Sequence, residues 1–381
     1  MPRTAVITGR GVVSPFGAGV QAFWSGLVAG QTAIGPITGF AAADLQPNAA
    51  AEVRVPRFEH PDRAGGFALH AAREALGEAG LVTDGVGVGV ALGTTLAGMA
   101  IFEAWDGAAI AGIERVPYYA PAVTLATELG CTGPVATPQL ACASGTHALA
   151  LATEWIRDGQ ADVVLAGGTD LLCRFVVSGF NCLRATALVA RPFDAEREGL
   201  VLGEGAAIVV IEEAGHATAR GARPLARLVG VGASADATHM TAPDRDGRGA
   251  TRAIEAALAD ARVPPSAVDY VSAHGTGTVY NDAMEAVAIA RVFGPDAVAV
   301  SGIKGAIGHT LGAAGALEAV LCTQVLETDV VPPTAGLREL AADCRGLDVV
   351  RGDARPHATH VAVSTSSGFA GANAALVLAE A

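Results

Sequence analysis

Cys142 is the residue of this chain whose surroundings are best suited to covalent chemistry. It lies in Gln139-Leu-Ala-Cys142-Ala-Ser-Gly-Thr-His147, where an apolar segment gives way to small residues that begin a predicted helix. Unpaired N–H groups and the positive end of the helix dipole favour a thiolate there, and so lower the pKa of the thiol. The same N–H groups can bind a tetrahedral oxyanion. The pattern predicts a cysteine nucleophile; the common alternative is a buried cysteine that packs like alanine.

Two histidines lie on loops that follow strand-like segments later in the chain. His274 lies in Val271-Ser-Ala-His274-Gly-Thr-Gly-Thr278, and His309 lies in the glycine-rich segment Lys304-Gly-Ala-Ile-Gly-His309. Loops at the ends of strands are where α/β proteins build their sites. One histidine alone is more often structural, but a cysteine with two such histidines is a set suited to nucleophilic attack and proton transfer.

Strand-like and helical segments alternate along the chain and would position these loops. Segments rich in valine, isoleucine and alanine predict strands at residues 5–7, 85–92, 162–166, 207–211, 270–273, 298–301 and 360–364. Apolar residues at helical spacing predict helices at residues 67–79, 147–158, 250–261, 282–292 and 312–327. The alternation predicts an α/β fold with a mostly parallel sheet covered by helices.

A polar, glycine-punctuated segment at residues 212–224 separates two parts of similar make-up. Each part contains a strand followed by small residues, as in Leu165-Ala-Gly-Gly-Thr-Asp170 and Val363-Ser-Thr-Ser-Ser-Gly-Phe-Ala-Gly371, which suggests an internal duplication. We divide the chain into an N-terminal half, residues 1–216, which carries the cysteine, and a C-terminal half, residues 217–381, which carries both histidines.

Composition argues against several classes of function. The net charge of −13 disfavours nucleic-acid binding, since a phosphate-binding face needs a basic stripe. No apolar run reaches the roughly 18 to 20 residues of a membrane-spanning helix, and the N-terminus lacks a secretory signal, so we expect a soluble cytoplasmic protein. The six cysteines form no C-x-x-C pair and are expected to be free. His357 and His360 have no third ligand nearby, so no metal site is expected.

The motifs together resemble those of the β-ketoacyl-acyl carrier protein synthases, the condensing enzymes of fatty acid and type II polyketide pathways. The resemblance covers nearly the whole chain, from Val6-Ile-Thr-Gly-Arg-Gly-Val-Val-Ser-Pro15 through Arg191-Pro-Phe-Asp194 and Glu198-Gly-Leu-Val-Leu-Gly-Glu-Gly205 to Gly368-Phe369-Ala-Gly-Ala-Asn373. It implies a thiolase-like fold of two similar halves, with mixed sheets layered between helices in the order αβαβα. It also implies decarboxylative Claisen condensation with malonyl-acyl carrier protein. No cofactor is expected beyond the phosphopantetheine that carries the substrates.

The resemblance also implies roles for single residues of the catalytic set. Cys142 resembles the nucleophile that accepts the acyl group. His274 and His309 resemble the pair that binds the malonyl thioester carbonyl and promotes loss of carbon dioxide. Lys304 and Glu318 resemble a supporting ion pair that orients the histidines without entering the chemistry. Each histidine should then favour its neutral form, because a neutral imidazole can donate an N–H to the developing enolate oxygen.

Three threonines and two backbone groups complete the implied binding machinery. Thr241, Thr276 and Thr278 resemble residues that line the phosphopantetheine tunnel, where hydroxyl groups bond the amides of the arm. They fit turn threonines as well. The backbone N–H groups of Cys142 and Phe369 resemble the two donors that stabilise the oxyanion.

The implied gate of the acyl pocket departs from the fatty-acid pattern. Ser367 and Leu200 stand where phenylalanine is common, and with Phe369 they make up the expected pocket gate. A smaller gate predicts a pocket open to long, unsaturated or bulky chains. Together with Asn281-Asp-Ala-Met-Glu285, it favours a type II polyketide or polyene ketosynthase. Ordinary fatty-acid elongation is the alternative.

The expected partners are an acyl carrier protein and a second subunit. Members of the family work as dimers, so we expect either a homodimer or a heterodimer with a subunit that resembles a chain-length factor. Because carrier proteins are acidic, an acidic ketosynthase needs a local basic patch to dock them. Arg57, Arg63 and Arg184 are the candidates for that patch.

Other classes of protein fit the sequence less well. A chain-length factor, the non-elongating partner subunit, lacks the nucleophile, and a thiolase would need Cys322 or Cys344 in a glycine-rich loop. A cysteine hydrolase would use one histidine with an Asn or Asp, and release of carbon dioxide from a malonyl thioester would separate it from a ketosynthase. A dinucleotide-binding oxidoreductase is suggested only weakly by residues 9–11 and 85–89. The first segment lacks the third glycine of the fingerprint, the glycines of the second alternate inside a predicted strand, and neither segment opens a helix.

Overall fold

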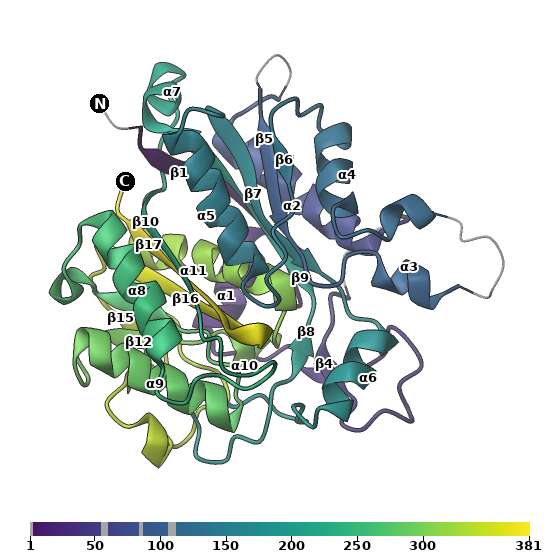
Figure 1. The fold of residues 1–381 in the computed structure, drawn as a ribbon, viewed down its shortest axis with the longest axis vertical. Coiled ribbons are helices and arrows are strands. Elements are labelled where there is room, and N and C mark those ends of the chain that lie inside the picture. The colour runs from purple at the N-terminus through teal and green to yellow at the C-terminus, as the bar shows by residue number, and fades with distance from the viewer. Residues whose placement is uncertain (1–2, 55–59, 84–86, 106–111) are drawn as a thin grey trace.

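A mixed sheet of twelve strands runs through the molecule, seen in a computed structural model that describes residues 3–54, 60–83, 87–105 and 112–381 (Figure 1). Its strands are β1 (Ala5–Ser14), β2 (Gly17–Ala18), β5 (Gly89–Gly93), β6 (Val135–Ala136), β7 (Val163–Asp170), β9 (Gly205–Glu213), β10 (Ala226–Ala235), β11 (Tyr270–Ser272), β12 (Ala299–Ser301), β14 (Asp348–Val349), β16 (Val361–Gly368) and β17 (Ala372–Ala379). Their order is β14-β12-β11-β16-β17-β10-β1-β9-β7-β5-β6, with β2 beside β1. Two small sheets pair β3 (Gly35–Pro36), β4 (Ala49–Ala51) and β8 (Leu202–Gly203), and β13 (Val330–Val331) with β15 (Arg355–Pro356).

The strand directions correct the expectation of a mostly parallel sheet. The pairs at both ends of the sheet are parallel, but the five central pairs, from β16–β17 to β9–β7, are antiparallel. The reason is visible at residues 369–371, a single short turn that joins β16 to β17. A connection of that length has no room for a crossover helix, so it imposes an antiparallel pair.

The five predicted helices are present and are accompanied by shorter ones. The helices are α1 (Val20–Val28), α2 (Arg63–Ala79), α3 (Met99–Glu103), α4 (Ala120–Glu128), α5 (Ser144–Arg157), α6 (Arg174–Cys182), α7 (Ala214–Ala219), α8 (Arg248–Ala261), α9 (Val279–Phe293), α10 (Lys304–Ile307) and α11 (Ala314–Thr328). Among the described residues, no helix has both the length and the apolar character needed to cross a membrane.

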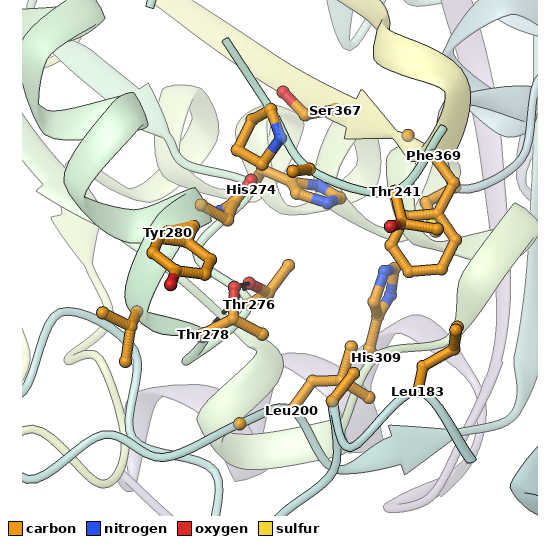
Figure 2. Close-up of a pocket in the computed structure, with 18 of the residues that line it drawn as sticks. Leu183, Leu200, Thr241, His274, Thr276, Thr278, Tyr280, His309, Ser367 and Phe369 are labelled. Carbon is orange, nitrogen blue, oxygen red and sulfur yellow. Dashed lines mark hydrogen bonds between the residues drawn. The ribbon is translucent and has the colours of Figure 1, made fainter. Parts of the chain in front are cut away.

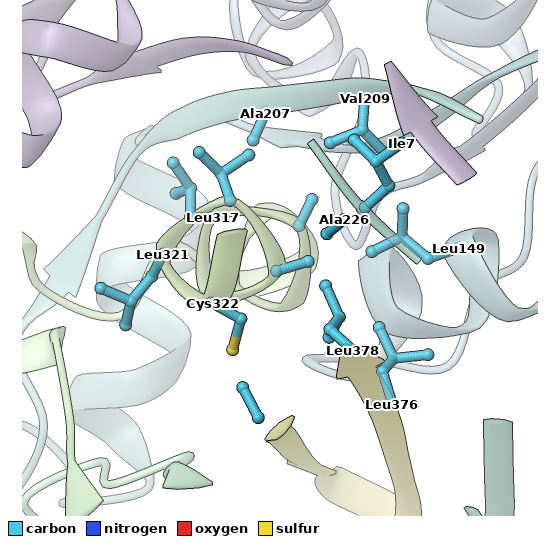
Figure 3. Close-up of a cluster of buried hydrophobic side chains, with 14 of the residues drawn as sticks. Ile7, Leu149, Ala207, Val209, Ala226, Leu317, Leu321, Cys322, Leu376 and Leu378 are labelled. Atoms are coloured by element: carbon cyan, nitrogen blue, oxygen red, sulfur yellow. The ribbon is translucent and has the colours of Figure 1, made fainter. Parts of the chain in front are cut away.

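Helices α5 and α11 form the middle layer between the two parts of the sheet, as Figure 3 shows for α11. Residues 314–326 of α11 are all buried, so this helix is enclosed by protein on every side and most of its residues are apolar. Leu317, Leu321 and Cys322 contribute to a core that also draws on β1, β9 and β17. Helix α2 covers the outer face of one part and α8 that of the other, which gives the expected αβαβα layering.

The two parts of the sheet repeat one topology. Strands β6-β5-β7-β9-β1 follow the same order as β12-β11-β16-β17-β10, and the equivalent edge strands β1 and β10 pair with each other. Gly9 in β1 and Gly230 in β10 are also equivalent, since a Cβ would lie 2.1 Å from Ala75 O in α2 or 2.2 Å from Ala257 O in α8. These glycines allow a helix to lie against a strand. Gly9 is therefore inside a strand, and does not belong to a dinucleotide-binding turn.

Candidate active site

The loop before α5 presents Cys142 to a pocket of about 340 Å³. Ala141 adopts a left-handed conformation with φ of 50°, and the N–H groups of Ala143 and Ser144 donate to Leu140 O and Ala141 O. The Ser144 hydroxyl accepts the Leu140 N–H at 2.9 Å and donates to Ala141 O at 2.6 Å. A left-handed alanine is strained, and such strain persists only where surrounding bonds enforce it. The turn therefore holds Cys142 in one place, two residues before the helix.

The protonation state of Cys142 differs from the expectation. Burial raises the pKa of its thiol to about 12; the positive charge of Lys304 opposes this shift and the carboxylate of Asp170 adds to it. The predicted lowering of this pKa by the helix start is therefore wrong for the free protein, because desolvation of the thiolate outweighs the helix dipole. The raised pKa means that the thiol of the free protein is protonated at neutral pH.

His274 and His309 come together from two loops of the C-terminal half (Figure 2), in the pocket that Cys142 also lines. Their ring centroids are 5.2 Å apart with the planes nearly perpendicular, and each residue is 2% exposed. The Leu311 N–H donates to His309 Nδ1 at 3.3 Å, and Lys304 Nζ lies 3.3 Å from His274 Nδ1. Because both Nδ1 atoms accept, the hydrogen of each neutral ring lies on Nε2. The pocket thus contains two imidazole N–H donors.

The electrostatics of the pocket keep both rings neutral. Burial, the charge of Lys304 and, for His274, the neighbouring His309 lower the pKa of each ring well below its usual 6.5. A cation beside a buried imidazole disfavours a second positive charge. The expectation that each histidine favours its neutral form is confirmed.

A pH profile would detect this feature of the histidines. Decarboxylation of a malonyl thioester is expected to hold its rate from about pH 8 to about pH 5.5, below the pH where an ordinary histidine is half protonated. The sign follows from the lowered pKa values of His274 and His309, which keep the donor form neutral as pH falls. Single-turnover release of carbon dioxide, measured with bound substrate, checks this. A loss of rate centred near pH 6.5 would contradict it.

Lys304 and Glu318 form a buried ion pair behind the histidines. Lys304 Nζ lies 2.5 Å from Glu318 Oε1 and also donates to His274 O. Burial raises the pKa of Glu318 to about 7, although Lys304 opposes this shift. The pair links α10 to the central helix α11 and touches His274, so it can orient the ring while staying out of the pocket lining.

Two acidic residues of α9 complete the support of the His274 loop. Glu285 accepts the N–H groups of His274 and Gly275 at 2.6 and 2.8 Å, and Asp282 accepts the N–H of Gly277 at 3.2 Å. The segment that contains Asp282 and Glu285 is noticeable in the sequence, but its hydrogen bonds to the His274 loop are not predicted from it. The available signal was the three-residue spacing of the two carboxylates, which puts both on one helix face directly after the loop.

Asp170 was also missed, and it joins the two halves below the nucleophile. It is fully buried and accepts the N–H groups of Thr95 and Leu96 from one half and of Gly312 from the other, at 2.7–2.9 Å. The Thr95 hydroxyl in turn donates to Ala141 O at 3.2 Å. A carboxylate that receives N–H groups from both halves fixes the cysteine loop relative to the histidine loops.

The three predicted threonines all line the pocket. The hydroxyl groups of Thr276 and Thr278 lie 2.9 Å apart on one wall, while Thr241 lies on the opposite loop (Figure 2). Arg197 lies beneath that wall, is buried, and donates to the carbonyl of Thr278 at 3.4 Å and of Val279 at 3.1 Å. The two walls leave hydroxyl groups facing one opening.

The predicted gate residues also meet at the pocket. Leu200, Ser367 and Phe369 line it, and the Ser367 hydroxyl donates to Asn373 Oδ1 at 2.9 Å. A Cβ on Gly368 would lie 3.3 Å from Cys142 N, so the loop that carries Phe369 lies directly against the cysteine loop. The structure therefore brings together the backbones of Cys142 and Phe369, the two expected oxyanion donors.

The three arginines predicted to dock the carrier protein have different structural surroundings. Arg57 lies outside the described residues. Arg63 was a wrong choice, because its guanidinium pairs with the buried carboxylate of Glu204 through contacts of 2.7 and 2.6 Å. Arg184 is exposed and lines the pocket mouth.

Comparisons with known proteins agree with this geometry. Models described as the β-ketoacyl synthase N-terminal and C-terminal domains match residues 3–217 and 225–338. A 3-oxoacyl-[acyl-carrier-protein] synthase 2 of Coxiella burnetii is 38% identical, over 99% of this chain and 98% of its own. A solved structure of the ishigamide ketosynthase/chain length factor matches with a TM-score of 0.94 and 38% identity over all of both chains. A type II polyketide ketosynthase solved with its acyl-carrier protein and bound to the hexaketide matches at 0.92 and 32%, again over all of both chains. The chain belongs to the β-ketoacyl synthase family.

Proposed function

We propose that this protein is a ketosynthase that condenses an acyl chain on Cys142 with malonyl-acyl carrier protein. The observation that carries the proposal is a pocket lined together by the buried thiol of Cys142 and two neutral imidazoles, His274 and His309. A thiol can hold an acyl group, and paired neutral N–H donors can stabilise an enolate at neutral pH. Neither a hydrolase nor a non-elongating subunit needs both features.

The first half-reaction transfers the acyl group. The Cys142 sulfur attacks the thioester carbonyl of the acyl carrier protein, a new C–S bond forms, and the old C–S bond breaks. The oxyanion of the tetrahedral intermediate accepts N–H groups from Cys142 and Phe369, whose loops lie against each other. The proton of the thiol passes to the released pantetheine sulfur. A thiol with a pKa of about 12 is thus deprotonated only as the acyl group arrives.

The second half-reaction forms the carbon–carbon bond. The malonyl thioester carbonyl accepts the Nε2–H groups of His274 and His309, the bond to the carboxylate breaks, and carbon dioxide leaves with its electrons retained in the enolate. The enolate carbon attacks the thioester on Cys142, a carbon–carbon bond forms, and the sulfur leaves as a thiolate that takes up a proton. The product is a β-ketoacyl chain on the carrier protein.

The pocket wall and gate indicate how the substrates would be held. We propose that Thr241, Thr276 and Thr278 bond the amides of the phosphopantetheine arm, since all three hydroxyl-bearing residues line the entrance. Ser367 and Leu200 leave more room beside Cys142 than phenylalanine would. This favours polyketide or polyene assembly over ordinary fatty-acid elongation.

We also propose a division of labour between halves and subunits. Residues 1–216 would supply the nucleophile and residues 217–381 the two histidines, which fits the repeated topology. A second subunit, either a copy of this chain or a chain-length-factor-like relative, would complete the acyl tunnel. The ishigamide structure is named for both kinds of subunit. Six free cysteines support a reducing, cytoplasmic location.

Two arginines at the pocket mouth are suited to docking an acidic carrier protein. Arg184 lines the mouth, and Arg245 stacks over the Tyr280 ring at 4.5 Å. Within the described residues, neither forms an ion pair, so both charges remain available. In a chain of net charge −13, two unpaired cations beside one opening provide local attraction for an acidic partner.

Replacement of both arginines by alanine is expected to raise KM for malonyl-carrier protein about tenfold at low salt, with a smaller effect at high salt. Arg63→Ala is the control, because it should instead cost about 2 kcal/mol of unfolding free energy by leaving Glu204 buried without its counter-charge. Steady-state kinetics and thermal unfolding of the Arg184→Ala/Arg245→Ala and Arg63→Ala proteins check both results. An unchanged KM in the double variant would contradict this docking site.

The proposed function is tested by intact-mass analysis with acyl- and malonyl-carrier proteins, with and without a co-expressed partner subunit. An acyl adduct that maps to Cys142, release of carbon dioxide, and a β-ketoacyl product two carbons longer than the primer are expected. An adduct that is hydrolysed without elongation under both conditions would identify a hydrolase and overturn the proposal. The length and saturation of the product distinguish the polyketide or polyene pathway from fatty-acid elongation.

A further inference from the structure

The ring of Phe369 stacks against a second phenylalanine that comes from a distant part of the chain. Phe180 and Phe369 have ring centroids 5.6 Å apart and planes inclined by 27°. Phe180 lies near the end of α6, and Phe369 lies in the turn between β16 and β17. Both residues line the pocket that contains Cys142. Two distant segments of the chain therefore bring an aromatic pair to the lining of this pocket.

The turn that carries Phe369 has polar anchors on one side. The Ala370 N–H donates to Met240 O at 2.7 Å, and the Ser367 hydroxyl is bound to Asn373. The side chain at position 367 thus points its polar group at its own hairpin, and supplies no aromatic surface to the Phe369 ring. Phe180 supplies that surface from α6.

Helix α6 belongs to the apolar wall next to the nucleophile. Val176 and Val177 are buried in one cluster with Cys142 and Leu200, and Phe180 packs against that cluster. An acyl chain on the sulfur can therefore contact this wall. Phe180 is therefore placed both to contact the chain and to hold the Phe369 ring.

We propose that Phe180 determines acyl-chain specificity by holding the Phe369 ring across the acyl end of the pocket. The proposal rests on the ketosynthase function proposed above. A stacked pair is stabilised beyond the burial of its area, and the rings must shift apart before a wide chain can lie beside Cys142. Short linear chains need little displacement, whereas branched or rigid unsaturated chains need more. Phe180 thus contributes a penalty that grows with the width of the chain.

The helix offers a matched control for this residue. Phe175 is one of the two phenylalanines of α6, but it is 56% exposed and does not line the pocket. The rate of adduct formation on Cys142 would be measured by intact mass with two substrates. One carrier protein bears a short linear acyl chain, and the other bears a branched acyl chain with the same number of carbons. In Phe180→Ala the branched-to-linear rate ratio is expected to rise about three- to tenfold, the effect of losing one aromatic pair. In Phe175→Ala the ratio should equal that of the parent protein.

The outcomes separate this inference from the proposed function. If the parent protein forms no adduct with either substrate, the ketosynthase proposal fails. If the parent forms adducts but Phe180→Ala leaves the ratio unchanged, only the role of Phe180 is overturned. Because the ratio is taken within one variant, a general loss of activity cancels. Phe180→Leu, which keeps the apolar bulk but lacks the ring, serves if the alanine variant does not fold, and its ratio must also rise.

Discussion

Cys142→Ala is expected to lose condensation by roughly four orders of magnitude or more, because no other group can hold the acyl chain between the two half-reactions. The same variant should still release carbon dioxide from malonyl-carrier protein. The reason is that His274 and His309 are positioned by Lys304, Glu285 and Leu311, none of which depends on the sulfur. Product analysis by mass spectrometry and carbon dioxide release, measured on one sample, check both halves of this result.

Cys182→Ala is the control for the nucleophile. Cys182 ends α6 and is exposed, so its loss should leave both reactions at the parental rate. Full elongation by Cys142→Ala would overturn the covalent scheme. Loss of both elongation and decarboxylation from a folded Cys142→Ala protein would instead show that the histidines need the thiol, against the independence of their supports.

His309→Ala is expected to slow decarboxylation by roughly 10² to 10³-fold, the usual effect of removing one donor to a developing oxyanion. The variant loses the Nε2–H that the enolate needs, and the Leu311 N–H loses its acceptor. Acylation of Cys142 uses the backbone N–H groups of Cys142 and Phe369 and not the His309 ring, so the acyl adduct should still form. Single-turnover carbon dioxide release and intact-mass analysis separate the two steps.

His360→Ala is the matched control for this variant, because His360 is exposed and pairs with Glu380 far from the pocket. It should decarboxylate at the parental rate. A His309→Ala protein that decarboxylates normally, while its thermal unfolding is unchanged, would remove His309 from the second half-reaction and leave His274 as the single imidazole donor.

Helices and strands could be predicted where the sequence carries a strong local pattern of apolar residues. The helices α2, α5, α8, α9 and α11 have long apolar repeats and were found within a few residues of their ends. Strands β10 and β17 were missed. Strand β10 carries glycines that make way for α8, and β17 is rich in alanine, so neither has the run of bulky β-branched residues that marks a strand.

The candidate site could be foreseen where chemistry requires a residue type. Cys142, His274, His309, Lys304 and Glu318 were selected from the sequence, and the structure places the first three around one pocket with the ion pair behind them. Asp170 was not foreseen, because a carboxylate buried between halves has no local signature. Its partners come from two segments far from it in the chain, residues 94–96 and Gly312.

The sequence by itself determined which groups are available: a cysteine before a helix, two histidines on glycine-rich loops, and a serine where a bulky gate is common. Only the tertiary structure decided their state. Burial raises the pKa of Cys142 and lowers the pKa values of both histidines. The contacts of Lys304 with His274 Nδ1 and of the Leu311 N–H with His309 Nδ1 leave the hydrogen of each ring on Nε2. It also turned Arg63 from a docking candidate into the counter-charge of Glu204. The physical reason is that residue type and spacing are local, whereas desolvation and charge pairing depend on which segments meet.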